Sequence, residues 1–204
     1  MRSFTPPGAK GRCARCLLLS DFCVCGAIGV GLPTTPAVVV VRHRWEAWKS
    51  TNTARLAHLA LSNSRILDMS AEHPEPVREE LARLPGAWLV YPGVASPQSP
   101  AEVPQTLVVL DGTWRQTRKM LRRLPELSSF PRLSLPDDAP DRRRLRQPPV
   151  AGARSTIEAI AEALGQLGQS EPRDRLLRLH DLFVAQTLRS RGQLKALPDL
   201  PTLR

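Results

Sequence analysis

Residues 107–120, which read LVVLDGTWRQTRKM, decide the fold of this chain. The stretch opens with a run of branched apolar residues, which is typical of a strand buried on both faces of a sheet. After Asp111 the apolar spacing becomes helical, and Thr113 is suited to cap the helix that follows. The candidates for the buried side of this helix are Trp114, Met120, Leu121 and Leu124. Asp111 is therefore expected at the carboxyl end of a central strand, where open α/β sheets bind their ligands. The alternative is that Asp111 and Thr113 only close a turn, because both residue types are common in turns.

The remaining segments predict an α/β domain in which strands and helices alternate. Further strands are expected at residues 37–41, 64–69, 87–91 and 131–136. Helices are expected at about residues 45–61, 76–84, 155–164 and 173–190, with Gly165, Gly168 and Pro172 separating the last two. A chain of 204 residues is long enough for one such domain with a proper core.

The net charge and the apolar runs of the chain limit which partners and which compartment can be expected. It carries 29 Lys and Arg against 19 Asp and Glu, for a net charge of +10. Such an excess favours a polyanionic partner, nucleic acid before an anionic membrane, although it also occurs on plain solvated surfaces. No apolar run approaches the roughly 18–20 residues that span a bilayer, and residues 1–12 lack the apolar core of a secretory signal. We therefore expect a cytoplasmic protein that does not enter a membrane.

All four cysteines of the chain lie within one short segment. Cys13, Cys16, Cys23 and Cys25 follow the pattern C-x2-C-x6-C-x-C, which suits a tetrahedral zinc ion. The alternatives are free or oxidised thiols, and two disulfides are disfavoured because the cytosol keeps thiols reduced. Four thiolates leave no open coordination position, so the metal is expected to be structural, and we expect the main core to lie elsewhere.

Polar residues also gather in three other segments. His43, Glu46, Lys49, Asn52 and Arg55 recur every three residues, so neighbours lie on adjoining helical positions, and the simplest interpretation is a solvated face with a Glu46–Lys49 pair. A second cluster, Arg142, Arg143, Arg144 and Arg146, is either a solvated loop or a clamp for RNA. In the third segment, Ser155 and Glu158 fit a capping box at the start of a helix.

Four ordered blocks of the sequence, over roughly residues 13–190, resemble the DTW-domain family. Asp111-Gly112-Thr113-Trp114 is similar to the D-x-T-W signature of that family, and residues 43–53 resemble its H-x-x-E-x-x-K-x-T-N-T block. Residues 155–159 resemble its S-T-x-E-A block, and the cysteine quartet resembles its N-terminal cysteines. A Tyr-Pro element at residues 91–92 is also similar. Two departures concern the local backbone: Arg44 stands where many members have proline, and Ala54 where they often have glycine.

The resemblance implies a fold and an activity. Members of the family are tRNA-uridine aminocarboxypropyltransferases related to the knotted SPOUT methyltransferases. The implied fold is an open, mostly parallel α/β sheet flanked by helices, SPOUT-like and knotted near its C-terminal part, with a small N-terminal zinc-binding element. The implied organisation is a basic lead-in and zinc element at residues 1–30, a catalytic domain at 31–192 and a tail at 193–204. The implied partners are S-adenosyl-L-methionine as group donor, structural zinc and tRNA, with no obligate protein partner.

The same resemblance distributes roles over the residues. The residues implied to be catalytic are Asp111, Thr113 and Trp114. Asp111 is the implied base that takes the N3 proton of uridine. Trp114 is a candidate to stack on the uracil or to back the donor pocket, and Lys49 or an arginine to hold the donor carboxylate. The residues implied to bind the donor are Tyr91, Pro92, Gly93, Leu110, Gly112, Ser155, Thr156 and Glu158. Those implied to bind RNA are His43, Arg44, Glu46, Lys49, Asn52, Arg55, Arg142, Arg143 and Arg144.

Two alternatives stay open at the level of sequence. A SPOUT-type RNA methyltransferase would share the fold and the donor. A non-catalytic, zinc-containing RNA-binding module would explain the charge and the cysteines, but not the acid at a strand end. The chain has no G-x-G-x-x-G or Walker A loop that would favour another cofactor.

Overall fold

A computed structural model describes residues 11–92, 103–136, 142–145 and 153–194. Within these residues, five parallel strands form one sheet in the order β2-β1-β4-β3-β5. The strands are β1 (Ala37–His43), β2 (Ser64–Met69), β3 (Ala87–Val90), β4 (Thr106–Asp111) and β5 (Arg132–Leu133). The stretch around residue 107 is thus the central strand, as predicted.

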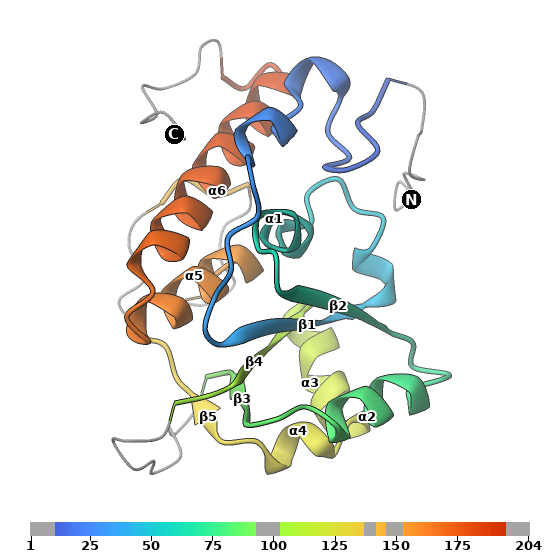
Figure 1. The fold of residues 1–204 in the computed structure, drawn as a ribbon. Coiled ribbons are helices and arrows are strands. Elements are labelled where there is room, and N and C mark those ends of the chain that lie inside the picture. The colour runs from blue at the N-terminus through green and yellow to red at the C-terminus, as the bar shows by residue number, and fades with distance from the viewer. Residues whose placement is uncertain (1–10, 93–102, 137–141, 146–152, 195–204) are drawn as a thin grey trace.

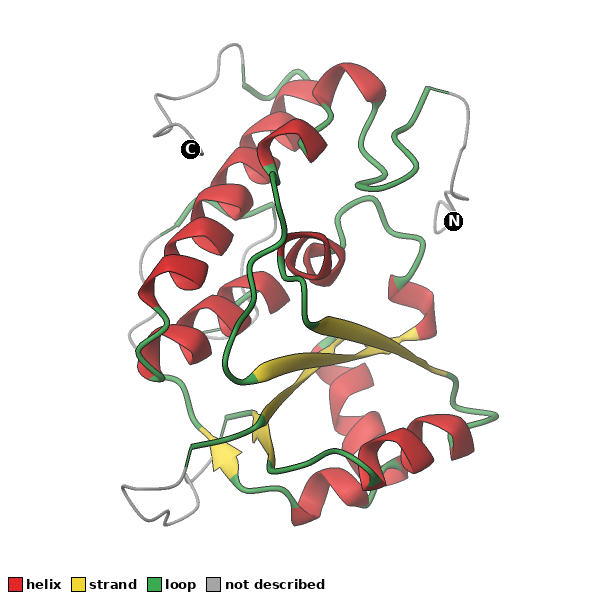
Figure 2. Cartoon of the chain, viewed as in Figure 1, coloured by secondary structure: helices red, strands yellow, loops and turns green. Residues whose placement is uncertain are grey.

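Helices cover both faces of the sheet, as Figures 1 and 2 show. The first layer holds α1 (Thr53–Ala60), α5 (Thr156–Gln166) and α6 (Ser170–Ser190). The opposite layer holds α2 (Glu75–Ala82), α3 (Trp114–Arg123) and α4 (Glu126–Ser129). Short 3-10 helices lie at η1 (Ser20–Phe22), η2 (Cys25–Ala27) and η3 (Arg44–Glu46). No described helix has the length and the apolar character that crossing a membrane requires.

The central strand β4 explains why both layers are needed. Its side chains alternate between the faces, as strand geometry dictates. Leu107 and Val109 pack in the cluster of α1, α5 and α6, while Val108 and Leu110 pack in the cluster of α2, α3 and α4. A continuous apolar run is therefore stable only with both faces covered.

The structure corrects three expectations about the elements. The helix expected from residue 45 begins only at Thr53, after η3 and a turn. The predicted last strand is reduced to Arg132–Leu133, and Pro172 lies inside the first turn of α6 and does not precede the helix. A proline is tolerated in a first turn because its missing N–H has no intrahelical partner there.

The N-terminal segment with the cysteines packs on the first helical layer. Cys16, Leu18, Val24 and Ile28 belong to the same buried cluster as α1, α5 and α6. The expectation that the main core lies apart from this segment is therefore wrong. The segment has too few apolar residues to bury a core of its own, so it shares the larger one.

Candidate functional site

The carboxyl ends of β1 and β4 bring the predicted catalytic acid to one edge of the sheet. Asp111 is the last residue of β4 and pairs in register with Arg42 of β1. Only 5% of its surface is exposed. A buried carboxylate needs hydrogen-bond partners, because its hydration shell is lost.

Two predicted blocks supply those partners. Asn52 donates from Nδ2 to Oδ2 of Asp111 at 2.6 Å, and Thr156 donates from Oγ1 to Oδ1 at 2.5 Å. The Asn52 amide is held in this orientation because its Oδ1 accepts the N–H of Arg55 and so caps α1. The segments around residues 52, 111 and 156, far apart in the sequence, therefore converge on one carboxylate.

Burial shifts the pKa of the Asp111 carboxyl group. Loss of solvent raises the pKa of Asp111 above its ordinary value, against the opposing effect of the Thr156 and Asn52 hydrogen bonds. The negative charge of Glu46, which is itself buried and paired with Lys49, raises it further. The carboxylate is thus a stronger proton acceptor than an exposed aspartate.

The turn after Asp111 is held by a capping box. Thr113 Oγ1 accepts the N–H of Gln116 at 3.3 Å, and Gln116 Oε1 accepts the N–H of Thr113 at 2.7 Å. Gln116 Nε2 also lies 3.2 Å from Nδ1 of His43. A Cβ on Gly112 would lie 3.1 Å from Cβ of Gln116 and 3.5 Å from Cβ of His43, so glycine permits this close approach. Sequence reasoning missed Gln116, although its position three residues after Thr113 is the signal of a capping box.

Aromatic residues follow the two strands that neighbour β4 in the sheet, β3 and β1. Trp114 is partly exposed and not a core residue, because its helix position faces Tyr91 at the end of β3, with ring centroids 6.4 Å apart. The guanidinium of Arg132 lies 5.8 Å from the Tyr91 ring. Trp45, in η3 directly after β1, is 53% exposed, and the guanidinium of Arg44 lies 4.8 Å from the centroid of its ring. Pro92 is exposed, while Gly93 lies outside the described residues.

Hydrogen bonds within the protein hold the segment that joins β1 to α1. Arg55 donates to the carbonyl oxygens of Ala47 and Lys49, and these bonds fold residues 47–52 as a turn where a helix was expected. Burial lowers the pKa of Arg55 to about 10. Arg44 pairs with Glu72 and donates to Ser70. Most of the polar residues proposed to bind RNA therefore have structural partners.

The predicted arginine clamp is also largely paired. Arg142 forms an ion pair with Asp181 at 2.7 Å, and Arg144 forms one with Glu158 at 3.0 Å. Arg143 alone among these three is exposed. Glu158 is 1% exposed and also accepts the Ser155 N–H at 2.8 Å, which completes the predicted capping box. It thereby fixes the start of α5, where Thr156 meets Asp111.

The four cysteines converge on one point, as the zinc prediction requires. Their sulfur atoms all lie within 4.8 Å of one another, with Cys13–Cys25 at 3.6 Å and Cys16–Cys23 at 3.8 Å. Tetrahedral zinc with Zn–S bonds of about 2.3 Å places its ligands roughly 3.8 Å apart. All four cysteines are free of disulfides, so the donor set fits a structural zinc ion.

Comparison with known proteins relates this arrangement to a family. The DTW domain matches residues 10–188. The chain belongs to the DTW-domain family. A Drosophila melanogaster protein named tRNA-uridine aminocarboxypropyltransferase 2 is 29% identical over 202 residues, which cover 90% of this chain and 78% of the relative. No solved structure matches the chain significantly. The family resemblance inferred from the sequence blocks is confirmed.

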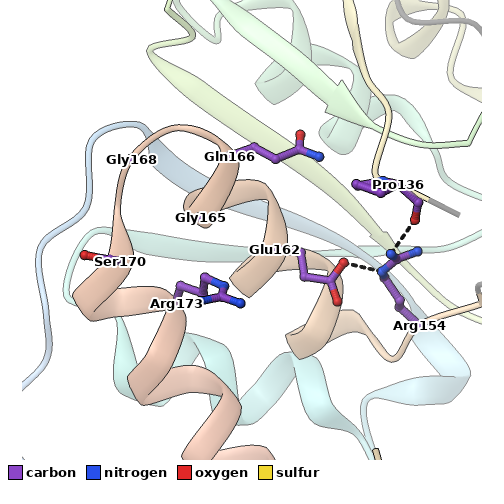
Figure 3. Close-up of a pocket in the computed structure, with 8 residues that line it drawn as sticks. All are labelled: Pro136, Arg154, Glu162, Gly165, Gln166, Gly168, Ser170 and Arg173. Carbon is purple, nitrogen blue, oxygen red and sulfur yellow. Dashed lines mark hydrogen bonds and ion pairs between the residues drawn. The ribbon is translucent and has the colours of Figure 1, made fainter. Parts of the chain in front are cut away.

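This DTW-domain protein also has a cavity of about 400 Å³, which Asp111 and its partners Asn52 and Thr156 do not line. Its lining combines residues of α5, α6 and the turn between them with two residues from other segments: Pro136, Arg154, Glu162, Gly165, Gln166, Gly168, Ser170 and Arg173. Figure 3 shows Arg154 reaching both Glu162 and the carbonyl oxygen of Pro136. None of the site residues predicted from the sequence lines this cavity, so the candidate active site remains the carboxyl edge of the sheet.

The buried Glu158 pair predicts a pH-dependent stability in this DTW-domain protein. Burial alone would raise the pKa of Glu158, but Arg144, His180 and Ser155 hold it below its ordinary value. Its stabilising effect is therefore present above the unfolded pKa of about 4.3 and is lost as the pH falls through the lower folded value. Breaking a buried pair costs about 3–5 kcal/mol.

Glu158→Gln should therefore lower the melting temperature at pH 7, by roughly 2–4 °C per kcal/mol. The difference from wild type should shrink as the pH falls from 7 to 3. Thermal unfolding across this range checks the expectation, with Glu79→Gln as the control, because Glu79 is an exposed partner of Arg83. A difference that does not vary with pH would mean that the Glu158 charge contributes no stability.

Proposed function

We propose that the protein transfers the 3-amino-3-carboxypropyl group of S-adenosyl-L-methionine to N3 of a uridine in tRNA, with 5′-methylthioadenosine as the by-product. The observation that carries the proposal is the convergence of three family blocks on the buried Asp111 carboxylate at the ligand-binding edge of the sheet. The name of the 29% identical relative, tRNA-uridine aminocarboxypropyltransferase 2, supports the same reaction. Four free cysteines agree with a cytoplasmic location.

The donor side of the site is proposed to lie between the ends of β3 and β4 and the start of α5. Tyr91, Pro92, Leu110, Gly112, Ser155 and Thr156 come from these three places. Glu158 is proposed to act indirectly, because its carboxylate is occupied by Arg144 and Ser155. When bound, the donor supplies a carbon activated by a sulfonium group, and the departing thioether takes the electrons of the broken C–S bond.

Asp111 is proposed to accept the N3 proton as the N3–carbon bond forms. Asn52 and Thr156 each donate one hydrogen bond to it, and each carboxylate oxygen retains a lone pair for a further proton. Its raised pKa improves it as a base. Thr113 holds the turn that aims it, and Trp114 is proposed to stack on the uracil, since its ring is partly exposed.

The RNA side is proposed to use the cations that remain accessible. Arg44 and Lys49 keep 40% and 22% of their side chains exposed, and Arg143 is also exposed. His43, Glu46, Asn52, Arg55, Arg142 and Arg144 are proposed to support the site indirectly through their partners within the protein. We also propose the SPOUT relationship and a C-terminal knot, which the all-parallel sheet supports.

Two competing functions make different demands on the site. A methyltransferase would use the same donor but direct its methyl carbon to the base. A non-catalytic RNA-binding module would have no use for a buried acid with a raised pKa.

The test is to incubate the protein with tRNA and S-adenosyl-L-methionine and to determine the masses of the nucleosides. A uridine that has gained the aminocarboxypropyl group, together with free methylthioadenosine, is expected. A methylated nucleoside, or unmodified tRNA under conditions where the protein binds it, would overturn the proposal.

A further inference from the structure

The exposed face of α3 carries an unusual concentration of positive charge. Five of its ten residues are exposed cations and none is acidic: Arg115, Arg118, Lys119, Arg122 and Arg123. Spacings of three and four residues place all five on one side of the helix. The opposite side, with Thr117 and Met120, is buried against the sheet. The helix is about 15 Å long, so it presents a compact positive stripe.

These cations differ from those on the neighbouring helix. Arg78 of α2 pairs with Glu126, and Arg83, which directly follows α2, pairs with Glu79. Among the residues that the structure describes, none of the five α3 cations forms an ion pair, and only Arg118 and Arg123 have hydrogen bonds, both to backbone carbonyl oxygens. The stripe therefore keeps its charge available to a partner.

Helix stability alone does not account for this arrangement. The helix dipole favours cations near the C-terminus, which suits Arg122 and Arg123. It disfavours Arg115, which lies in the first turn of the helix. Like charges four residues apart, such as Arg115 and Lys119, also repel each other. A polyanion on this face would relieve both effects.

The position of the stripe connects it to the candidate active site. α3 starts directly after the turn that holds Asp111, and Arg115 is the second residue of the helix. We infer that the α3 face binds the phosphate backbone of tRNA and orients the target uridine toward Asp111. This inference rests on the proposed function, and it assigns RNA contacts to five residues in a helix that the sequence had suggested only as a structural element.

The stripe is better suited to RNA than the arginine loop at residues 142–144. Arg142 and Arg144 are committed to Asp181 and Glu158, so their charges are already balanced. The α3 cations are exposed and have no acidic partner among the described residues. Phosphate contacts release counterions from the nucleic acid, which makes affinity depend on salt.

The experiment compares two triple variants with equal loss of charge. The test variant is Arg115→Gln, Arg118→Gln and Lys119→Gln, since glutamine is a good helix former. The control is Arg173→Gln, Arg189→Gln and Arg191→Gln, at α6 in the opposite layer. The affinity for tRNA is measured as a function of salt, together with KM and kcat.

The test variant should lower the log–log salt slope by about 0.7–0.9 for each contact, or roughly 2–3 in all, and raise KM for tRNA with kcat near wild type. The control should keep the wild-type slope. An unchanged slope in the test variant, or equal losses in both variants, would overturn the inference. If wild type modifies tRNA but the test slope is unchanged, only this inference fails. If the slope falls but no aminocarboxypropyl uridine forms, the proposed reaction fails and the RNA surface stands.

Discussion

Asp111→Asn should reduce turnover by about 10²–10⁴-fold, the usual contribution of a general base. The substitution preserves the shape of the side chain and its hydrogen bonds. The new amide oxygen can still accept from Asn52, and its NH₂ group can donate to Thr156, whose hydroxyl also accepts. The variant should therefore fold and bind tRNA while losing the proton acceptor. Single-turnover rates with saturating donor and tRNA measure the effect.

The matched control for this variant is Asp68→Asn. Asp68 is the last but one residue of β2, Asp111 is the last residue of β4, and both pair in register with Arg42 of β1. Asp68 forms an ion pair with Arg42 and its side chain is 48% exposed, so its loss should leave turnover close to wild type. Full activity of Asp111→Asn, or equal loss in both variants, would remove Asp111 from the role of base.

Loss of the metal should have the second large effect, on stability. We expect one zinc ion per chain, held by the four sulfur atoms that lie within 4.8 Å of one another. Zinc-finger peptides gain on the order of 10–16 kcal/mol from such a metal, which is comparable with the 5–15 kcal/mol that stabilises a typical domain. The core of α1, α5 and α6 includes Cys16, Leu18, Val24 and Ile28. Removal of the zinc ion should therefore destabilise this helical layer as well.

Elemental analysis and thermal unfolding check this expectation. A chelator should lower the melting temperature strongly, and added zinc should restore it. Cys16→Ser, which alters the most buried of the four ligands, should reproduce the effect without a chelator. Purified protein that contains no zinc, has four reactive thiols and melts at the same temperature with chelator would contradict the assignment.

Local patterns predicted the secondary structure around Asp111 and Thr156 correctly. The apolar run before Asp111, the Thr113 cap and the Ser155–Glu158 capping box all depend on residues within a few positions of one another. For the same reason the strand at residues 64–69 was predicted with its observed bounds. Such signals are visible in sequence because strand burial and helix caps are encoded locally.

The contacts that were not predicted connect distant residues. Asn52 meets Asp111 across 59 positions, and Arg142 meets Asp181 across 39. The spacing of residues along the sequence cannot show whether a cationic side chain will be exposed or will pair with an acid elsewhere in the chain. The helix expected at residue 45 failed for the same reason, because Arg55 folds back on Ala47 and Lys49. Tertiary contacts override helical spacing in such segments.

The central claim concerns which carbon of the donor moves. The most direct measurement uses S-adenosyl-L-methionine labelled in the methyl carbon or in the aminocarboxypropyl carbons, with the same protein and tRNA in both reactions. We predict that the aminocarboxypropyl label enters a uridine of the tRNA, while the methyl label leaves in methylthioadenosine. Methyl label in the RNA, with the other label remaining in the small-molecule product, would contradict the proposed transfer.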